Sequence, residues 1–271
     1  MVRRWFPALA AALLLAGCGS PDPSVPTPAA ATPSVVLSPT DTAAGTVYAP
    51  ADLDGDARRA WLERLRRTVG ILADTDLGPA DDDWDGRLAV ELPQTSADYA
   101  ALAGPAGAEA AAVTRCLGDG SRITINPAVR DTGADYLDAL VLHEAVHAAT
   151  GSACRPAPLW IEEGLAEWLT VQHHPAAAQT NQQWLTRELA GGLPSGLPED
   201  AAFQGTAEQV SGGYALAVFA VDTAIGRLGQ ARAMAYFAAP DEPTTRQLTG
   251  WYLDGLRARL GPPAATASAP R

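Results

Sequence analysis

The sequence of 271 residues contains no lysine, so all 19 of its basic residues are arginine. They are outnumbered by 31 acidic residues, which gives a formal net charge of -12, and they form no basic cluster. This balance disfavours binding to nucleic acid or to anionic lipid through charge alone. Beyond its first eighteen residues the chain also lacks the uncharged apolar run of about 18 residues that a membrane-spanning helix needs. We therefore expect no nucleic-acid partner and no transmembrane helix in the body of the chain.

Only three cysteines are present, and the first ends an N-terminal processing signal. Two arginines precede an apolar run over residues 5–15, and Leu-Ala-Gly-Cys occupies residues 15–18. This arrangement resembles the lipobox of bacterial lipoproteins. The resemblance implies that residues 1–17 are a signal peptide, and that a diacylglycerol on Cys18 anchors the protein to the extracytoplasmic face of the cell membrane. An ordinary secretory signal with an incidental cysteine is the alternative.

The two other cysteines, Cys116 and Cys154, form an even pair in a chain expected to be exported. Disulfides persist in oxidising compartments outside the cytoplasm. We therefore predict a disulfide between Cys116 and Cys154, with two free thiols as the alternative.

The chain is predicted to contain one folded domain between two low-complexity ends. Residues 18–50 are rich in Pro, Ala, Ser and Thr without a periodicity that could bury one face, which predicts a tether. The domain is expected over residues 51–261 and a disordered tail over residues 262–271. Within the domain, the patterns predict helices at 54–72 and 96–102, strands at 87–92, 111–116 and 122–126, and a mainly helical chain from residue 132.

Strands first and helices afterwards indicate an α+β fold. We expect a small N-terminal antiparallel or mixed sheet, followed by a mainly helical subdomain, with one buried helix between them. That helix is predicted at residues 135–150, which are apolar on nearly all sides. Thr132 and Asp135 have capping-box spacing at its start, and Gly151 can end it in the left-handed conformation.

Three polar residues, His143, Glu144 and His147, lie within this apolar helix. Residues four apart on a helix are displaced by only ~40° and ~6 Å, so the two histidines can bind one ion. Imidazole nitrogens suit Zn²⁺, and three protein ligands leave a position for water, whose pKa zinc lowers to about 7. Glu144 then has the place of a general base that activates this water. The alternative is a buried polar network without metal.

A third ligand is expected from the downstream segment 159–168, LWIEEGLAEW. The histidine and glycine that would continue the motif in metzincins are absent, because the corresponding positions hold Ala153 and Thr150. Two prolines break the chain after the first helix, so a second helix beginning near Leu159 can pack back against it. Glu162 and Glu163 are both candidates, and they point about 100° apart on a helix.

The combined pattern resembles the gluzincins, in particular the peptidase MA-like and aminopeptidase-like families. They share HExxH followed by W-x-x-E-G-x-A, matched here by His143, Glu144, His147, Trp160, Glu163, Gly164 and Ala166. The resemblance implies a zincin-like fold, with Glu163 as the third zinc ligand. Glu167, one turn later, is then placed to accept a hydrogen bond from a zinc-bound histidine. No Gly-x-Met-Glu-Asn motif is present to bind a substrate amino terminus, which favours endopeptidase over aminopeptidase action.

Further residues could serve the substrate. Tyr214 is expected to begin a strongly apolar helix with Ser211 as its N-cap, and its hydroxyl could donate to the oxyanion of a tetrahedral intermediate, with a core tyrosine as the alternative. The strand at 122–126 could pair with an extended peptide. His173 and His174 are interpreted as exposed loop residues.

The expected function is zinc-dependent hydrolysis of peptide bonds in a peptide or protein substrate, with Glu144 acting on the zinc-bound water. A non-catalytic zinc-binding lipoprotein, serving as a binding or assembly module in the cell envelope, is the main alternative, and hydrolysis of a non-peptide amide is a second one.

Overall fold

The computed structural model describes residues 35–77, 84–105, 107–117, 120–155 and 157–260. The strands are β1 (Ser38–Thr42), β2 (Gly45–Ala49), β3 (Leu88–Glu91), β4 (Ala112–Leu117) and β5 (Gly120–Ile125). The α-helices are α1 (Gly55–Asp74), α2 (Ser96–Ala103), α3 (Ala134–Thr150), α4 (Leu159–His173), α5 (Pro175–Ala190), α6 (Ala207–Leu228), α7 (Gln230–Ala238) and α8 (Glu242–Leu260). Two short 3-10 helices are η1 (Pro127–Val129) and η2 (Asp200–Phe203).

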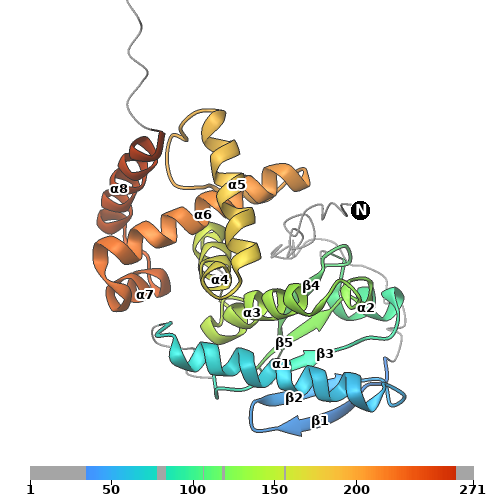
Figure 1. Ribbon diagram of the computed structural model, residues 1–271. Helices are drawn as coiled ribbons and strands as arrows, with labels where there is room; N and C mark the ends of the chain where they lie inside the picture. The colour runs from blue at the N-terminus through green and yellow to red at the C-terminus, as the bar shows by residue number, and fades with distance from the viewer. Residues whose placement is uncertain (1–34, 78–83, 106, 118–119, 156, 261–271) are drawn as a thin grey trace, which may run out of the picture.

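The five strands form one mixed sheet in the order β1-β2-β3-β5-β4. Antiparallel pairs at each side, β1 with β2 and β4 with β5, flank the parallel pairs of β3 with β2 and with β5. The sheet therefore has two edges, β1 and β4. The predicted α+β class is confirmed, with the sheet formed by the N-terminal part of the chain and most helices by the C-terminal part (Figure 1).

One face of the sheet is covered by α1 and α3. Alternate residues of β2, β3 and β5 are fully or almost fully buried against these helices: Val47, Ala49, Leu88, Val90, Ile123 and Ile125. Because side chains alternate between the two faces of a strand, this pattern places all six on one side. Asp138 of α3 joins the two helices, since its carboxylate accepts from Arg64 at 2.5 Å and from Arg67 at 2.7 Å, both on α1. The histidine-bearing helix α3 is thus packed against α1 and the sheet, and it also contacts α4.

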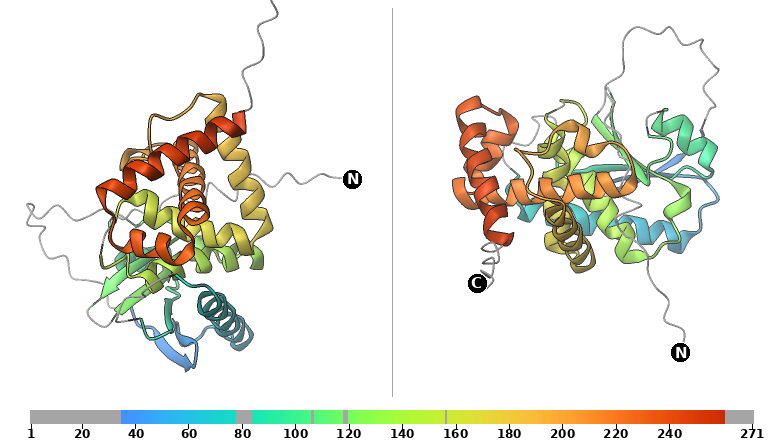
Figure 2. Two further views of the ribbon diagram at one scale, coloured as in Figure 1. Left: turned by 90° about the vertical axis from the view of Figure 1, so that its left-hand side faces the viewer. Right: turned by 90° about the horizontal axis from the view of Figure 1, so that it is seen from above.

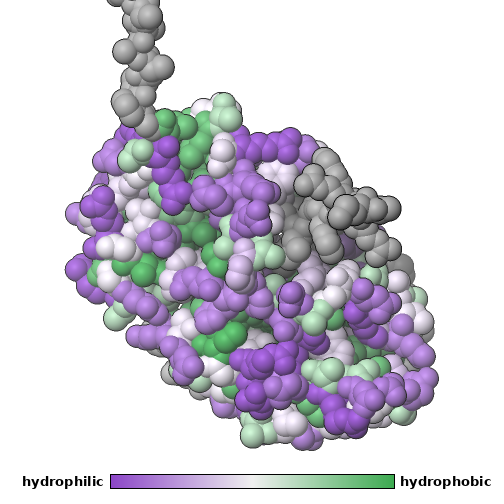
Figure 3. Space-filling model, in the orientation of Figure 1, coloured by the Kyte–Doolittle hydropathy of each residue, from purple (hydrophilic) through white to green (hydrophobic). Residues whose placement is uncertain are grey.

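The C-terminal helices pack around α6, which contacts α4, α5, α7 and α8 (Figures 1 and 2). α6 begins with a capping box, in which the Thr206 hydroxyl accepts from Gln209 N and the Gln209 side chain accepts from Thr206 N. Residues 210–221 of this helix are almost entirely buried, which explains their apolar sequence. The face drawn in Figure 3 is mainly polar, with apolar areas over the C-terminal helices. Within the described residues, no helix is long and apolar enough to cross a membrane.

The predicted tether over residues 18–50 is wrong for its last part, because residues 38–49 form the β1–β2 hairpin. Val47 and Ala49 of β2 are fully buried, so this segment belongs to the core of the domain. The backbone at the start of β2 requires a glycine, which is Gly45. Its φ is 140°, and a Cβ there would lie 1.9 Å from the carbonyl oxygen of Leu88 on the neighbouring strand. The domain therefore begins before residue 51, while the predicted signal peptide, Cys18 and the predicted tail lie outside the described residues.

Most other predicted elements are confirmed within a few residues, including α1, α2, β3, β4, β5 and α3. Two details differ. The Thr132 hydroxyl donates to the carbonyl of Val129 at 2.6 Å, so α3 begins after Gly133 without a side-chain cap. The strand at 122–126 corresponds to β5, which pairs on both sides with β3 and β4. A peptide therefore cannot add to β5 as an extra strand.

Candidate metal centre

The candidate site lies where α3 and α4 pack together. α3 is buried along most of its length, and it ends at Gly151, which has the left-handed conformation with φ 68°. The chain then reverses and enters α4 after Pro158. The first backbone N–H of α4 has a partner outside the helix, since Leu159 N donates to Asp200 Oδ1 of η2 at 3.2 Å. This reversal brings the buried face of α4 against the histidines of α3.

Three side chains meet in this position. His143 Nε2 lies 3.2 Å from Glu163 Oε2 and 3.3 Å from His147 Nε2. His147 Nε2 lies 3.6 Å from the same Glu163 oxygen. All three residues are at most 3% exposed, and their ligand atoms form a cluster that could hold a metal ion. The structure thus brings together the three residues that the sequence predicts as metal ligands.

The outer nitrogens of both imidazole rings also have neighbours. His143 Nδ1 lies 3.4 Å from Glu167 Oε2, and His147 Nδ1 lies 3.0 Å from the Ser152 hydroxyl. Glu167 thus lies beside the histidine nitrogen that points away from the cluster, although these two atoms are not in hydrogen-bonding geometry. The hydrogen bond between Ser152 and His147 is of the kind that fixes the tautomer and the orientation of a ligating histidine.

Glu144 is buried beside this cluster and does not belong to it. Its Oε2 accepts a hydrogen bond of 2.6 Å from the hydroxyl of Thr114, on the edge strand β4. The same hydroxyl lies 3.0 Å from the backbone carbonyl of Glu144. Glu144 is thus a carboxylate that directly follows His143 in the chain and is hydrogen-bonded to a strand, not to the three-residue cluster.

The charges of the cluster complement one another. Burial lowers the pKa of His143, but the neighbouring carboxylates of Glu163 and Glu167 outweigh it and raise this pKa to about 10. Burial raises the pKa of Glu163, but His147 and His143 outweigh it and lower this pKa well below its usual range. The surroundings therefore keep Glu163 ionised and, without a metal, His143 protonated, so a cation that binds here would have to displace the proton of His143.

The ring of Tyr214, on α6, packs beside the ring of His143. The two rings are 6.0 Å apart between centroids, and Phe203 of η2 packs edge-on against Tyr214 at 5.7 Å. Burial raises the pKa of the Tyr214 hydroxyl well above its ordinary value, and the carboxylates of Glu163, Glu167 and Glu144 add to this effect. The hydroxyl therefore stays protonated and can act as a hydrogen-bond donor. Tyr214 does not begin its helix, because α6 begins seven residues earlier, at Ala207.

Glu162, the rival ligand, has another role. Its carboxylate accepts a hydrogen bond from the backbone N–H of Ala157 ahead of α4, and it is not part of the ligand cluster. Burial raises its pKa to about 7. His173 is exposed as expected, whereas His174 is partly buried, and its Nε2 has no hydrogen-bond partner among the residues that the structure describes. Neither histidine belongs to the cluster.

The cluster fits a zinc ion in chemistry and in spacing. Two imidazoles and one carboxylate are a common ligand set for catalytic zinc. Ligands held ~2.1 Å from a tetrahedral zinc lie about 3.4 Å from one another, and the three observed separations are 3.2, 3.3 and 3.6 Å. Glu163 Oε1 is also buried without a hydrogen-bond partner within the described part of the chain. A bound cation would compensate this desolvated carboxylate.

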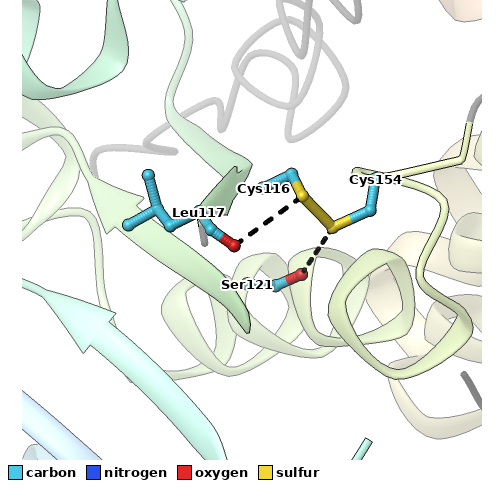
Figure 4. The surroundings of a disulfide bond; sticks show 4 residues. All are labelled: Cys116, Leu117, Ser121 and Cys154. Atoms are coloured by element: carbon cyan, nitrogen blue, oxygen red, sulfur yellow. Dashed lines mark hydrogen bonds between the residues drawn. A yellow bond between two sulfur atoms is a disulfide. The ribbon is translucent and has the colours of Figure 1, made fainter. Parts of the chain in front are cut away.

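The predicted disulfide is present between Cys116 of β4 and Cys154 in the turn after α3 (Figure 4). The Cα atoms lie 4.9 Å apart, within ordinary bridging distance. Ser121 of β5 lies beside it, with its hydroxyl 3.9 Å from the Cys154 sulfur. The bridge therefore connects the edge of the sheet to the segment that leaves the histidine helix.

Sequence reasoning missed Thr114 and Ser152. Thr114 contacts a residue 30 positions later in the chain, and no local pattern marks such a pair. Ser152 follows Gly151, so a small polar residue just after the helix end was the only local signal. Comparison of the chain with protein-family models, with curated proteins and with solved structures found no match.

Proposed function

We propose that this protein is a zinc-dependent endopeptidase, held on the extracytoplasmic face of the cell membrane by a lipid on Cys18. The observation that carries the proposal is the meeting of His143 Nε2, His147 Nε2 and Glu163 Oε2 at separations of 3.2 to 3.6 Å. A carboxylate that is not a ligand, Glu144, stands next to the first histidine on the same buried helix. This combination favours metal-assisted hydrolysis over a site that only stores or senses a metal.

In this proposal, His143, His147 and Glu163 hold the zinc. When bound, zinc would supply a Lewis acid that polarises the scissile carbonyl and makes water easier to deprotonate. Glu144 takes a proton from the attacking water and passes it to the leaving amine. The Thr114 hydrogen bond engages one Glu144 oxygen, Oε2, and leaves Oε1 for the proton. Tyr214, which keeps its proton, donates to the developing oxyanion.

Two sequence features support the substrate class and the location. No motif for binding a substrate amino terminus is present, which supports cleavage within a peptide chain. The Leu-Ala-Gly-Cys sequence at 15–18 supports lipid attachment at Cys18. Two acyl chains are enough for stable membrane anchoring.

The alternative is a non-catalytic zinc-binding lipoprotein that serves as a binding or assembly module. The zinc ligands alone are equally compatible with that role. Glu144 separates the two proposals, because a binding module needs no proton acceptor beside its metal.

The decisive experiment compares the full-length protein with its Glu144→Gln variant. Zinc content is measured by elemental analysis and cleavage by digestion of a denatured peptide library. We expect about one zinc per wild-type chain and equal zinc in the variant, because Gln keeps the shape and the contact with Thr114. Proteolysis should fall by at least about a hundredfold, the lower end of the contribution of a positioned general base.

Glu162→Gln is the matched control. It changes another buried glutamate that directly neighbours a ligand, and its amide oxygen can still accept from Ala157 N. Proteolysis by this variant should stay near the wild-type rate. A zinc-loaded wild type that cleaves nothing in the library would remove the peptidase proposal in favour of the binding module. Loss of zinc from Glu144→Gln would show that Glu144 is a ligand or a structural residue.

A further inference from the structure

Two hydroxyl groups contact the candidate site from outside the ligand cluster. The Thr114 hydroxyl donates to Glu144 Oε2 at 2.6 Å, and the Ser152 hydroxyl lies 3.0 Å from His147 Nδ1. His147 Nε2 faces the cluster, so a neutral ring that binds metal through Nε2 carries its proton on Nδ1. The Ser152 oxygen is then the acceptor of that proton. Each hydroxyl thus fixes one side chain, the proposed base in one case and a ligand in the other.

One covalent bridge connects the two segments that carry these hydroxyls. Cys116 follows Thr114 by two residues on β4, and Cys154 follows Ser152 by two residues in the turn after α3. Figure 4 shows the bridge running from the strand to this turn. The disulfide therefore ties the partner of Glu144 to the partner of His147.

The position of β4 explains why such a bridge matters. β4 is an edge strand, and its backbone pairs with β5 on one side only. Thr114 is paired with Ile123, whose side chain is buried against the helices, so the Thr114 side chain lies on the same face of the sheet. The turn after α3 is held by hydrogen bonds from Cys154 N and Arg155 N to the carbonyl of Gly151, both at 2.9 Å. These hydrogen bonds lie within the turn, whereas the disulfide joins the turn to β4.

We propose that Thr114 and Ser152 are positioning residues for Glu144 and His147, and that the Cys116–Cys154 disulfide holds both in place. The catalytic part of this inference rests on the proposed peptidase function, whereas the part that concerns Ser152 requires only metal binding. The Thr114 hydroxyl orients the Glu144 carboxylate, and the Ser152 hydroxyl orients the His147 ring toward the ion.

The test uses full-length variants and two kinds of measurement. Thr114→Val removes the hydroxyl at nearly constant volume and should lower kcat by about tenfold or more, with KM and zinc content unchanged. Thr114→Ser restores the hydroxyl and should restore kcat. Ser152→Ala should weaken zinc affinity, measured by competition with a chelator, by about 10- to 100-fold. The Cys116→Ser/Cys154→Ser double variant should show both losses.

Ser121→Ala is the matched control, because the Ser121 hydroxyl lies 3.9 Å from the Cys154 sulfur and contacts neither Glu144 nor His147. It should keep wild-type kcat and zinc affinity. The proposal is overturned if Thr114→Val keeps kcat, if Thr114→Ser is as slow as Thr114→Val, or if Ser152→Ala binds zinc like wild type. If the double cysteine variant fails to fold, reduction of the folded wild type with a non-chelating phosphine tests the disulfide: unchanged kcat and zinc affinity overturn that part, and the single hydroxyl variants decide the rest.

Failure of the peptidase function would be seen separately. Zinc affinity of Ser152→Ala is measured without any substrate. For Thr114, melting temperatures of Thr114→Val, Glu144→Ala and the double variant should be non-additive if the two side chains are coupled. Additive changes in melting temperature would show that Thr114 does not position Glu144, whether or not the protein cleaves peptides.

Discussion

His143 Nδ1 and Glu167 Oε2 lie 3.4 Å apart across the packed faces of α3 and α4, both in the buried interior. The ring nitrogen on the other side of His143 faces Glu163 and His147 in the candidate cluster. Glu167 therefore contacts a proposed ligand without being one. This relationship follows from helical spacing, because Glu167 stands one turn after Glu163 on α4.

Glu167→Ala should weaken zinc binding by about 10- to 100-fold, the usual effect of removing a partner of a ligating histidine. The protein should still bind zinc stoichiometrically at high concentration, since all three ligands remain. Competition with a fluorescent chelator measures the affinity. Glu208→Ala, which removes an exposed glutamate on α6, is the control and should bind like wild type. Wild-type affinity in Glu167→Ala would show that the contact is only structural.

The two adjacent glutamates of α4 should behave differently on substitution. Glu163→Ala should lower zinc affinity steeply, because it removes one of three protein ligands. Glu162→Ala should retain zinc but lower the melting temperature, because the partly buried N–H of Ala157 loses its acceptor. Zinc titration and thermal melts of the two variants provide the measurement. Zinc loss in Glu162→Ala with retention in Glu163→Ala would reverse the ligand assignment.

Gly164 is required by the close approach of α4 and α6. A Cβ at this position would lie 2.9 Å from the carbonyl oxygen of Ala217 and 3.0 Å from Val221 Cγ2. Gly164→Ala should therefore reduce the free energy of unfolding by ~1–3 kcal/mol, the usual cost of overpacking. It should also weaken zinc binding, because Glu163 is the preceding residue.

The control for this prediction is Gly250→Ala in the exposed part of α8, where a Cβ meets nothing within 4 Å. Alanine is the better helix former, so this variant should gain ~0.5–1 kcal/mol of stability. Denaturant unfolding of both variants measures the difference. An equal response at the two positions would contradict the packing argument.

Cys18→Ala should release the protein from membranes. Lipid attachment needs the thiol, so the variant should move from the membrane fraction to the soluble fraction on ultracentrifugation. Its melting temperature and zinc content should match wild type, because the described helices and strands and the candidate site are formed by residues 38–260. A wild-type protein that is already entirely soluble would remove the lipoprotein assignment.

Much of the candidate site was predictable because its signals are local. The spacing of His143 and His147 acts within one helix turn, and the apolar residues around them indicate burial. The choice between Glu162 and Glu163 needed the family resemblance, since both lie at the start of the same helix. In the structure, one accepts the N–H of Ala157 and the other joins the histidines.

The missed features depend on contacts between distant parts of the chain. The β1–β2 hairpin has few large apolar residues, and Val47 is buried only because β3 and α1 cover it. Thr114 faces Glu144 because of the register between β4 and β5, which a single strand pattern does not specify. Because residues 38–49 contain few large apolar residues, their composition predicted a tether and placed the start of the domain too late.

The β1 strand has a further consequence for how molecules of this protein meet one another. It is an edge strand, with Pro39 and Asp41 exposed along it. Proline has no N–H to donate to a new strand, and a charge on an edge opposes close stacking. This edge therefore resists the intermolecular strand pairing that leads to aggregates and fibrils. Colloidal stability of the folded protein thus depends in part on two residues on β1, at the opposite edge of the sheet from Thr114.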